Sequence, residues 1–295
     1  MIRILIHSHD PALCLAAEEY ILENYTSDEY IMLWRGERSV IIGKNQNAYG
    51  EVSLTQCEKY AVPIYRRNSG GGTVYHDLGN INFSFFSDMG ESTDYSRFLV
   101  PVRDFLRTLG IPAELGSSFD ITVQGKKISG NAQAVHRGRV MHHGTLLFDA
   151  DLGVLSTVTS HAREKAVSKA VKSNPSPVGN VSEFIPSMTA EDFEDGLGKY
   201  FTLSEKTFSR EENDIIKKLA DEKYRTWDWI FGRSPRFDLN GENITLTAKN
   251  GVIISAGEYS AVLNGMRLIP SEIYEAVSRN YGVNTAERLI KDIFE

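Results

Sequence analysis

Residues 66–80 combine residue types that bind anions. The stretch reads RRNSGGGTVYHDLGN, so two arginines stand shortly before three consecutive glycines. Glycines lack a Cβ atom, so their backbone N–H groups can point at a ligand and bulky groups can approach the chain. An arginine grips a phosphate or a carboxylate in a planar fork. The stretch is a candidate phosphate cradle, although it lacks the Gly-Lys-Ser/Thr ending of a P-loop.

The two arginines are expected to have different roles. Arg66 and Arg67 end a predicted strand, and adjacent strand residues point to opposite faces. Only one of them should therefore meet the ligand. A glycine-rich hairpin turn with surface arginines is the alternative, and a lone glycine motif does not separate the two. Three glycines are more than a hairpin turn needs, which favours a ligand site.

A second source of positive charge lies in GKKISGNAQ, residues 125–133. If the segment is extended, only one of Lys126 and Lys127 faces a site on the inner surface of a sheet. A lysine there would neutralise charge that develops on a carboxylate or phosphate, as a mobile point cation. The alternative is a solvated turn lysine, which is the commoner fate of this residue type.

The histidines indicate neither a metal site nor a serine hydrolase. His142 and His143 are neighbours on a predicted strand and should point in opposite directions. The sequence has no H-x-x-x-H or C-x-x-C spacing, so a zinc site is not expected. His76 and Asp77 could form a His–Asp pair. Ser69, the nearby serine, is not in a G-x-S-x-G elbow.

Composition describes an ordinary globular protein. The 295 residues are 41% apolar and 24% charged, and 32 basic against 39 acidic residues give a formal net charge of −7. A nucleic-acid partner is therefore not expected. Cys14 and Cys57 occur in apolar, helix-like contexts, which favours buried thiols in a reducing compartment. The N-terminal stretch does not resemble a signal peptide, and no apolar run reaches the roughly 20 residues of a membrane span. We expect a cytoplasmic protein without a membrane partner.

The order of predicted elements argues against a doubly wound sheet. A helix should cover residues 10–25, because Asp10 can cap it and Pro11 fits its first position. Residues 29–36 and 38–45 are expected to form paired strands. Further hairpin strands and helices follow without the regular alternation of a Rossmann fold.

The pattern of predicted secondary structure changes near Pro235. Short strands with Asn-Gly turns at 240–241 and 250–251 follow, and two helices close the chain. We therefore predict one large domain over residues 1–235 and a small α+β domain over residues 236–295.

Taken together, these segments resemble the lipoate–protein ligase family of the biotin/lipoate protein ligase superfamily. RRNSGGGTVYHDLGNINFSF, GKKISGNAQ and HHGTLLFDADL occur in the family's order. The resemblance covers roughly residues 1–237, and residues 238–295 resemble a shortened form of the family's accessory domain. It implies an α+β fold whose large domain has mixed, mainly antiparallel sheets surrounded by helices.

The resemblance also implies a reaction in two steps. Lipoate and ATP, with Mg²⁺, would give lipoyl-AMP and pyrophosphate. The lipoyl group would then pass to a lysine of an apo lipoyl domain. The implied partners are the lipoyl domains of 2-oxoacid dehydrogenase acyltransferase subunits and the glycine cleavage H protein.

The family's motifs assign roles to individual residues of this sequence. Lys127 would be catalytic and would contact both the acyl carboxyl and the nucleotide. The residues implied to bind nucleotide are Arg67, Gly72, Thr73, Val74, Tyr75 and Lys127. Those implied to bind lipoate are Lys127, Gly71, Gly72, His143 and Gly144. The motifs name no metal ligand, and Arg66 is left with a structural role.

Two alternative functions stay open at this point. Residues 171–184, VKSNPSPVGNVSEF, carry Lys172 as their only basic residue where many bacterial ligases have arginines. This resembles members that transfer lipoyl from preformed lipoyl-AMP or another acyl donor. A non-catalytic sensor of lipoate or nucleotide is the other alternative. A transferase that uses a cysteine thioester is disfavoured because residues 144–295 contain no cysteine. The R-R-x-S-G-G-G pattern disfavours a biotin ligase.

Overall fold

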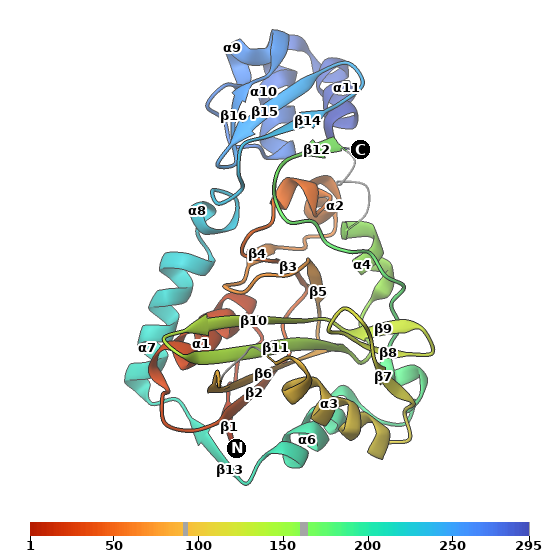
Figure 1. Ribbon diagram of the computed structural model, residues 1–295. Coiled ribbons are helices and arrows are strands. Elements are labelled where there is room, and N and C mark those ends of the chain that lie inside the picture. Colours follow the sequence, from red (N-terminus) through yellow and green to blue (C-terminus); the bar gives the residue numbers. More distant parts are fainter. Residues whose placement is uncertain (91–93, 160–164, 295) are drawn as a thin grey trace.

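A six-stranded mixed sheet forms the centre of the lower, larger part of the protein in Figure 1. The computed structural model describes residues 1–90, 94–159 and 165–294. Four of the strands are antiparallel neighbours, and β1 and β13 continue the sheet in parallel from β2. In sheet order the strands are β10 (Asn131–His136), β11 (Arg139–Leu147), β6 (Asn80–Asp88), β2 (Tyr30–Trp34), β1 (Ile2–Leu5) and β13 (Ser204–Thr207).

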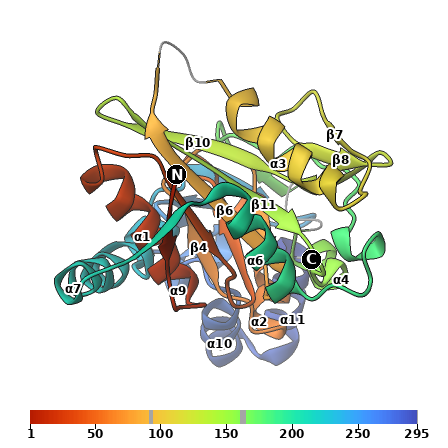
Figure 2. The ribbon, with the colours of Figure 1, turned by 90° about the horizontal axis from the view of Figure 1, so that it is seen from below.

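Helices cover both faces of this sheet (Figure 2). Side chains of a strand alternate between faces, so β2 sends Ile31 and Leu33 into one apolar core and Met32 into another. Helices α3 and α6 close the first core, and α1 and α7 close the second. The helices are α1 (Pro11–Asn24), α3 (Ser96–Thr108), α6 (Ala190–Phe201) and α7 (Arg210–Leu219). As predicted, the Asp10 side chain caps α1, accepting from the Ala12 N–H at 2.9 Å.

The expected pairing of residues 29–36 with 38–45 is wrong. Strand β2 pairs with β1 and β6, whereas β3 pairs with β4 and β5 in a separate three-stranded sheet. Strands β2 and β3 are buried along their whole length and show no exposed alternate positions, so the sequence pattern left their partners unspecified. The two small sheets contain β3 (Ser39–Ile42), β4 (Ile64–Arg66) and β5 (Val74–His76), and β7 (Ala113–Leu115), β8 (Ile121–Val123) and β9 (Lys126–Ser129).

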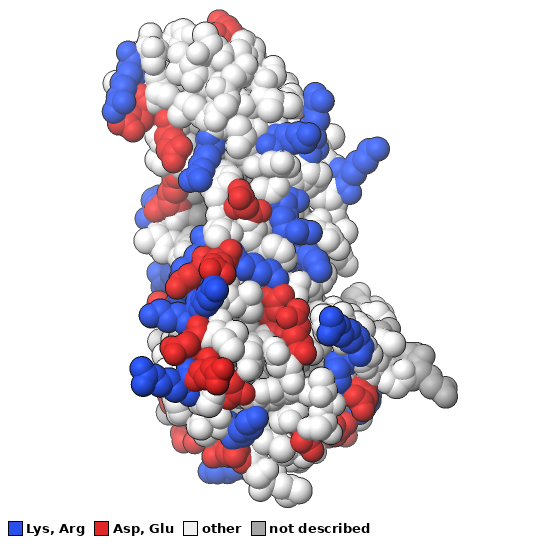
Figure 3. Space-filling view, turned by 90° about the vertical axis from the view of Figure 1, so that its left-hand side faces the viewer, with Lys and Arg blue, Asp and Glu red and all other residues white. Residues whose placement is uncertain are grey.

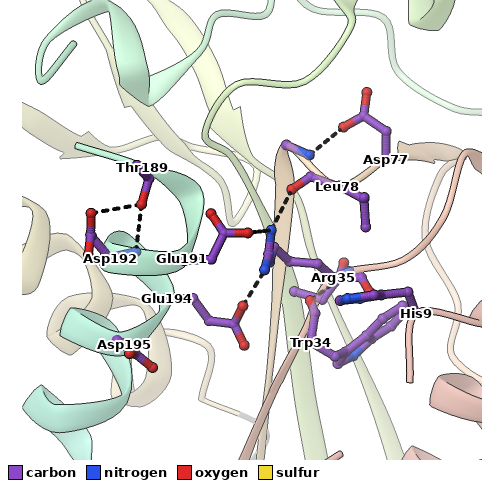
Figure 4. A network of polar contacts seen from close by, with 12 residues as sticks. His9, Trp34, Arg35, Asp77, Leu78, Thr189, Glu191, Asp192, Glu194 and Asp195 are labelled. Atoms are coloured by element: carbon purple, nitrogen blue, oxygen red, sulfur yellow. Dashed lines mark hydrogen bonds and ion pairs between the residues drawn. The ribbon is translucent and has the colours of Figure 1, made fainter. Parts of the chain in front are cut away.

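Arg35 fixes the direction in which the chain leaves β2 (Figure 4). Its guanidinium lies 2.8 Å from the carboxylate of Glu191 and 2.9 Å from that of Glu194, both on α6. The carbonyl of Arg35 contacts the His9 imidazole at 2.8 Å. These contacts tie α6 to the end of β2, directly after Trp34.

The C-terminal part is a second α+β unit built on its own sheet. Its three hairpin strands are covered by helices, and Asn250 and Gly251 have φ values of 53° and 72°, which a type I′ hairpin turn requires. The boundary near Pro235 stays a prediction. The elements are β14 (Phe237–Asn240), β15 (Thr245–Lys249), β16 (Val252–Ser255), η4 (Gly257–Tyr259), α9 (Ser260–Leu263), α10 (Pro270–Tyr281) and α11 (Val283–Phe294).

Two features join the C-terminal unit to the rest of the chain. The short strand β12 (Ala166–Val167), which precedes it by some seventy residues in sequence, pairs with β14 at the edge of its sheet. One apolar core also runs from β3 and α2 into the C-terminal unit, and Tyr49 stacks on Phe237 with ring centroids 4.9 Å apart. The remaining elements are η1 (Ala48–Gly50), α2 (Leu54–Lys59), α4 (Leu152–Thr159), η2 (Val181–Glu183), η3 (Ala220–Tyr224) and α8 (Trp227–Ile230). None of the described helices is long and apolar enough to cross a membrane.

Arg66 is a structural residue, as expected. Its side chain has no exposed area, and its guanidinium donates to backbone carbonyls of several segments. Among these bonds are Nη1 to Gln46 O at 2.7 Å and Nη2 to Ile230 O at 2.6 Å. Further acceptors are the carbonyls of Gly43, Lys44 and Trp229. One side chain thus joins β4 to the chain after β3 and to α8.

We predict that Arg66→Met lowers the free energy of unfolding by at least about 3 kcal/mol. The substitution leaves several buried carbonyls without donors, and each unsatisfied group costs about 1–3 kcal/mol. Urea unfolding measures the change. The control is Arg97→Met on an exposed part of α3, where a change within about 1 kcal/mol is expected. Equal effects of the two substitutions would contradict the structural role of Arg66.

Candidate active site

All the residues that the family motifs single out line two adjoining cavities. A cavity of about 370 Å³ is lined by Arg67, Gly71, Gly72, Thr73, Val74, Lys127, His143 and Gly144. A neighbouring cavity of about 560 Å³ shares Thr73, Val74 and Lys127 and adds Tyr75. The loop between β4 and β5 (residues 67–73, here termed the glycine loop) and the lysine segment (residues 125–133) belong to separate sheets and meet at these cavities. The roles predicted for the individual residues stay predictions.

Arg67 holds the glycine loop in shape. Its Nη2 donates to the carbonyls of Gly70 at 2.5 Å and Gly72 at 2.7 Å, and its Nε donates to Ser69 Oγ at 3.0 Å. Burial lowers the pKa of the guanidinium to about 10. Arg67 therefore puts a positive charge in the cavity wall, while most of its N–H groups are engaged by the loop itself.

Two glycines, Gly43 and Gly71, allow the glycine loop to pack closely against the chain that follows β3. Gly71 has a φ of 85°, in the left-handed region that glycine adopts without strain. A Cβ on Gly43 would lie 2.2 Å from the Gly71 carbonyl oxygen. The chain after β3 and the glycine loop therefore meet backbone to backbone.

A buried hydrogen-bonded chain runs from the glycine loop to α1. Ser69 Oγ lies 2.6 Å from His143 Nε2, and His143 Nδ1 lies 3.0 Å from a Glu18 carboxylate oxygen. Burial alone would raise the pKa of Glu18, but the His143 imidazole and hydrogen bonds from Ser84 and Trp34 hold it below its usual value. The order resembles a serine–histidine–acid triad. However, Ser69 does not line either cavity and accepts a hydrogen bond from Arg67, so the chain braces the loop.

The two lysines of the second segment diverge as expected. Lys126 is exposed and lies 3.1 Å from the Glu183 carboxylate. Lys127 lines both cavities, with 28% of its side chain exposed, and its Nζ lies 3.9 Å from an Asp120 carboxylate oxygen. Its backbone N–H donates to Pro177 O at 2.8 Å. Strand β9 therefore presents one lysine to the site and holds the segment that crosses it.

Residues 171–178, here termed the crossing segment, close over the glycine loop. Ser173 Oγ accepts from the Thr73 N–H at 2.8 Å and from Gln46 Nε2 at 2.9 Å. Glu51 accepts from the Ser173 N–H at 3.1 Å and also from its hydroxyl. A Cβ on Gly72 would lie 3.1 Å from Ser173 Oγ. The crossing segment thus occupies an N–H group of the predicted phosphate cradle.

His76 and His142 are also buried. His142 and His143 point in opposite directions as predicted, and His142 stacks on Phe98 with centroids 4.7 Å apart. The possible His76–Asp77 pair is not formed, because the Asp77 carboxylate accepts from the backbone N–H groups of Gly79 and Asp151. Burial lowers the pKa of both His76 and His142 to about 3.

Sequence reasoning missed five polar residues at the site: Glu18, Gln46, Glu51, Asp120 and Ser173. Glu18 carried a signal, because an acidic pair interrupts the otherwise apolar run LAAEEYIL. The other four lie in turns or loops, where polar side chains are usual.

The site shows no protein cage for a metal. In the described ranges, no group of three or more His, Cys, Asp or Glu side chains is placed to hold an ion.

Comparison with known proteins defines the family. Residues 10–202 match the family described as the lipoyl protein ligase A/B catalytic domain. Lipoate-protein ligase LplJ of Bacillus subtilis is 40% identical over 243 residues, covering 79% of this chain and 73% of the relative. A probable lipoate-protein ligase A of Mycoplasma pneumoniae is 30% identical over 302 residues, covering 96% and 89%. The chain belongs to the lipoate–protein ligase family.

Solved structures agree with the fold. A lipoate-protein ligase A bound with ATP is 30% identical, with a TM-score of 0.67 over 79% of this chain and 98% of that chain. A putative lipoate protein ligase of Thermoplasma acidophilum with bound lipoic acid is 29% identical, with a TM-score of 0.68 over 78% and 98%. The predicted α+β fold of the biotin/lipoate ligase type is confirmed.

We predict that acid destabilises the protein from about pH 6.5 downward. His76 and His142 stay neutral in the folded state down to a pKa of about 3, whereas they protonate near pH 6.5 once unfolded. Between these two pH values the unfolded state therefore binds more protons than the folded state. The free energy of unfolding decreases as the pH is lowered. Urea unfolding at pH 7.5, 6.0 and 5.0 measures the slope.

His142→Gln should make this slope shallower by up to about 1.4 kcal/mol per pH unit, the contribution of one proton. His7→Gln, at an exposed imidazole, is the control. An unchanged slope in the His142 variant would show that its imidazole does not contribute to the acid sensitivity.

Proposed function

We propose that the two cavities carry out ATP-dependent lipoate activation followed by lipoyl transfer to a lysine of an apo lipoyl domain. The observation that carries the proposal is the convergence of the glycine loop and Lys127 on one site. This convergence supplies backbone N–H groups and a partly exposed ammonium where two anions must meet.

In the first half-reaction, a lipoate carboxylate oxygen attacks the α-phosphate of ATP and pyrophosphate leaves. Two anions repel each other, and a lysine and an arginine in the wall offset that repulsion. Lys127 can reach both, because it lines both cavities. Mg²⁺, held mainly by phosphate oxygens, would neutralise further phosphate charge. The acyl tail would enter the smaller cavity, whose wall includes Leu15, Trp34 and Ile41.

The crossing segment must respond to nucleotide. Its Ser173 hydroxyl holds the Thr73 N–H, and Lys172 lines the smaller cavity. A phosphate that takes the Thr73 N–H displaces Ser173, and Lys172 then supplies positive charge near it.

The acceptor is proposed to be the lipoyl domain of a 2-oxoacid dehydrogenase acyltransferase subunit or the glycine cleavage H protein. On the face shown in Figure 3, acidic and basic side chains lie side by side over the larger domain. Some charged side chains of the larger domain pair with each other, such as Lys223 with Glu19 and Arg225 with Asp221. This face does not present one sign of charge, so the acceptor would be recognised elsewhere, around the cavity mouth. The buried free thiols of Cys14 and Cys57 support a reducing, cytoplasmic setting.

The test combines the protein, lipoate, Mg-ATP and an apo lipoyl domain and measures the intact mass of the acceptor. The expected result is a gain of one lipoyl group that requires ATP. A gain with synthetic lipoyl-AMP but none with ATP would instead establish the transferase. If the mass of the acceptor increases with neither ATP nor lipoyl-AMP, the protein would be a non-catalytic sensor. The relatives named lipoate-protein ligases favour the first outcome.

Lys127→Ala is predicted to reduce acceptor modification by at least 100-fold while leaving the protein folded. The lost charge would act on the acyl and phosphate oxygens, where removing one electrostatic contact typically costs about 10²–10³-fold in rate. Intact mass against time measures transfer, and urea unfolding checks the fold. Lys126→Ala, one residue away and outside both cavities, is the matched control. Undiminished modification by the Lys127 variant would remove Lys127 from the mechanism.

A further inference from the structure

Amide formation at this site needs a group that accepts a proton. The acceptor lysine's nitrogen becomes strongly acidic as its bond to the acyl carbon forms, and a general base placed there speeds the step. Lys127 and Arg67 are cations and are poor bases. The base must therefore come from another side chain of the cavity wall.

Only one of the described residues that line the cavities remains as a candidate for the general base once the others are considered. Glu18 is fully buried and already accepts from His143, Ser84 and Trp34. His143 is held between Ser69 and Glu18. The imidazole of His76, with its pKa near 3, is a weak base. The remaining carboxylate in the wall of either cavity is Asp120.

The geometry places Asp120 beside Lys127. One carboxylate oxygen lies 3.9 Å from Lys127 Nζ, and the other is buried without a hydrogen-bond partner among the described residues. Asp120 follows the turn after β7, where Gly116 N donates to Asp120 O at 3.0 Å. A Cβ on Gly116 would lie 1.9 Å from Asp120 Oδ1. The turn thus holds the carboxylate closely against bare backbone.

We propose that Asp120 is the general base that takes the acceptor lysine's proton during lipoyl transfer. The proposal rests on the ligase function above. The neutral amine attacks the acyl carbonyl, the C–N bond forms, and one N–H proton passes to the Asp120 carboxylate. The bond between the acyl carbon and the phosphate oxygen then breaks, and AMP leaves with both bonding electrons. Asp120 returns its proton to solvent.

The surrounding charges suit this role. Lys127 from β9, Lys172 from the crossing segment, Arg67 from the glycine loop and Glu18 from α1 share the cavity with Asp120. The three cations disfavour a charged acceptor ammonium, and so increase the fraction of neutral amine that can attack.

The experiment separates the two half-reactions. Lipoyl-AMP formation is measured as pyrophosphate release without acceptor, and transfer is measured in single turnover from synthetic lipoyl-AMP. Asp120→Asn should slow transfer by about 10²–10⁴-fold and leave lipoyl-AMP formation within about threefold of the parent protein. Glu114→Gln, at an exposed carboxylate on β7, is the matched control and should change neither rate.

A second variant distinguishes a base from a positioning residue. Asp120→Ala should regain transfer when acetate or formate is added, in proportion to the concentration of the carboxylate, while Asp120→Asn should not. Equal loss of both half-reactions without rescue would overturn the proposal, because Asp120 would then act by orienting Lys127. Failure of the parent protein to form lipoyl-AMP would instead overturn the ligase function.

Discussion

The site depends on two adjacent arginines at the end of β4, whose side chains bind different backbone segments. Arg66 binds carbonyls of the chain after β3 and of α8, and Arg67 binds the carbonyls of the glycine loop. A guanidinium has five N–H donors in a rigid fork, so each arginine fixes several backbone segments at once. The loop that should receive phosphate is therefore shaped before any ligand arrives, and binding does not have to order it.

Local patterns predicted much of the fold and the basic residues of the site. The Asp10 cap, the Asn250-Gly251 turn and the different partners of Arg66 and Arg67 follow from helix ends, turn chemistry and strand periodicity. These signals act over a few residues. The family motifs then placed Lys127 with the glycine loop, which no local pattern does.

Contacts between residues that are far apart in the sequence could not be predicted from local patterns. Glu18 reaches His143 across 125 residues, and Glu51 reaches Ser173 across 122. Each residue alone has the type expected of an ordinary helix or loop position. The wrong pairing of β2 with β3 has the same origin, because fully buried strands carry no alternation that marks a partner. Only tertiary packing specifies these contacts.

Strand β12 connects the C-terminal unit to the side of the site that the glycine loop forms. Ala166 and Val167 pair with β14, and the chain then has only five residues before Ser173 meets Thr73 and Glu51. Six residue steps of fully extended chain span at most roughly 20 Å. If the C-terminal sheet moves farther than this from the glycine loop, either the β12–β14 pairing or the contacts of Ser173 must break. The short strand therefore acts as a tether of fixed length, and it limits how far the two parts of the protein can separate while the crossing segment stays closed.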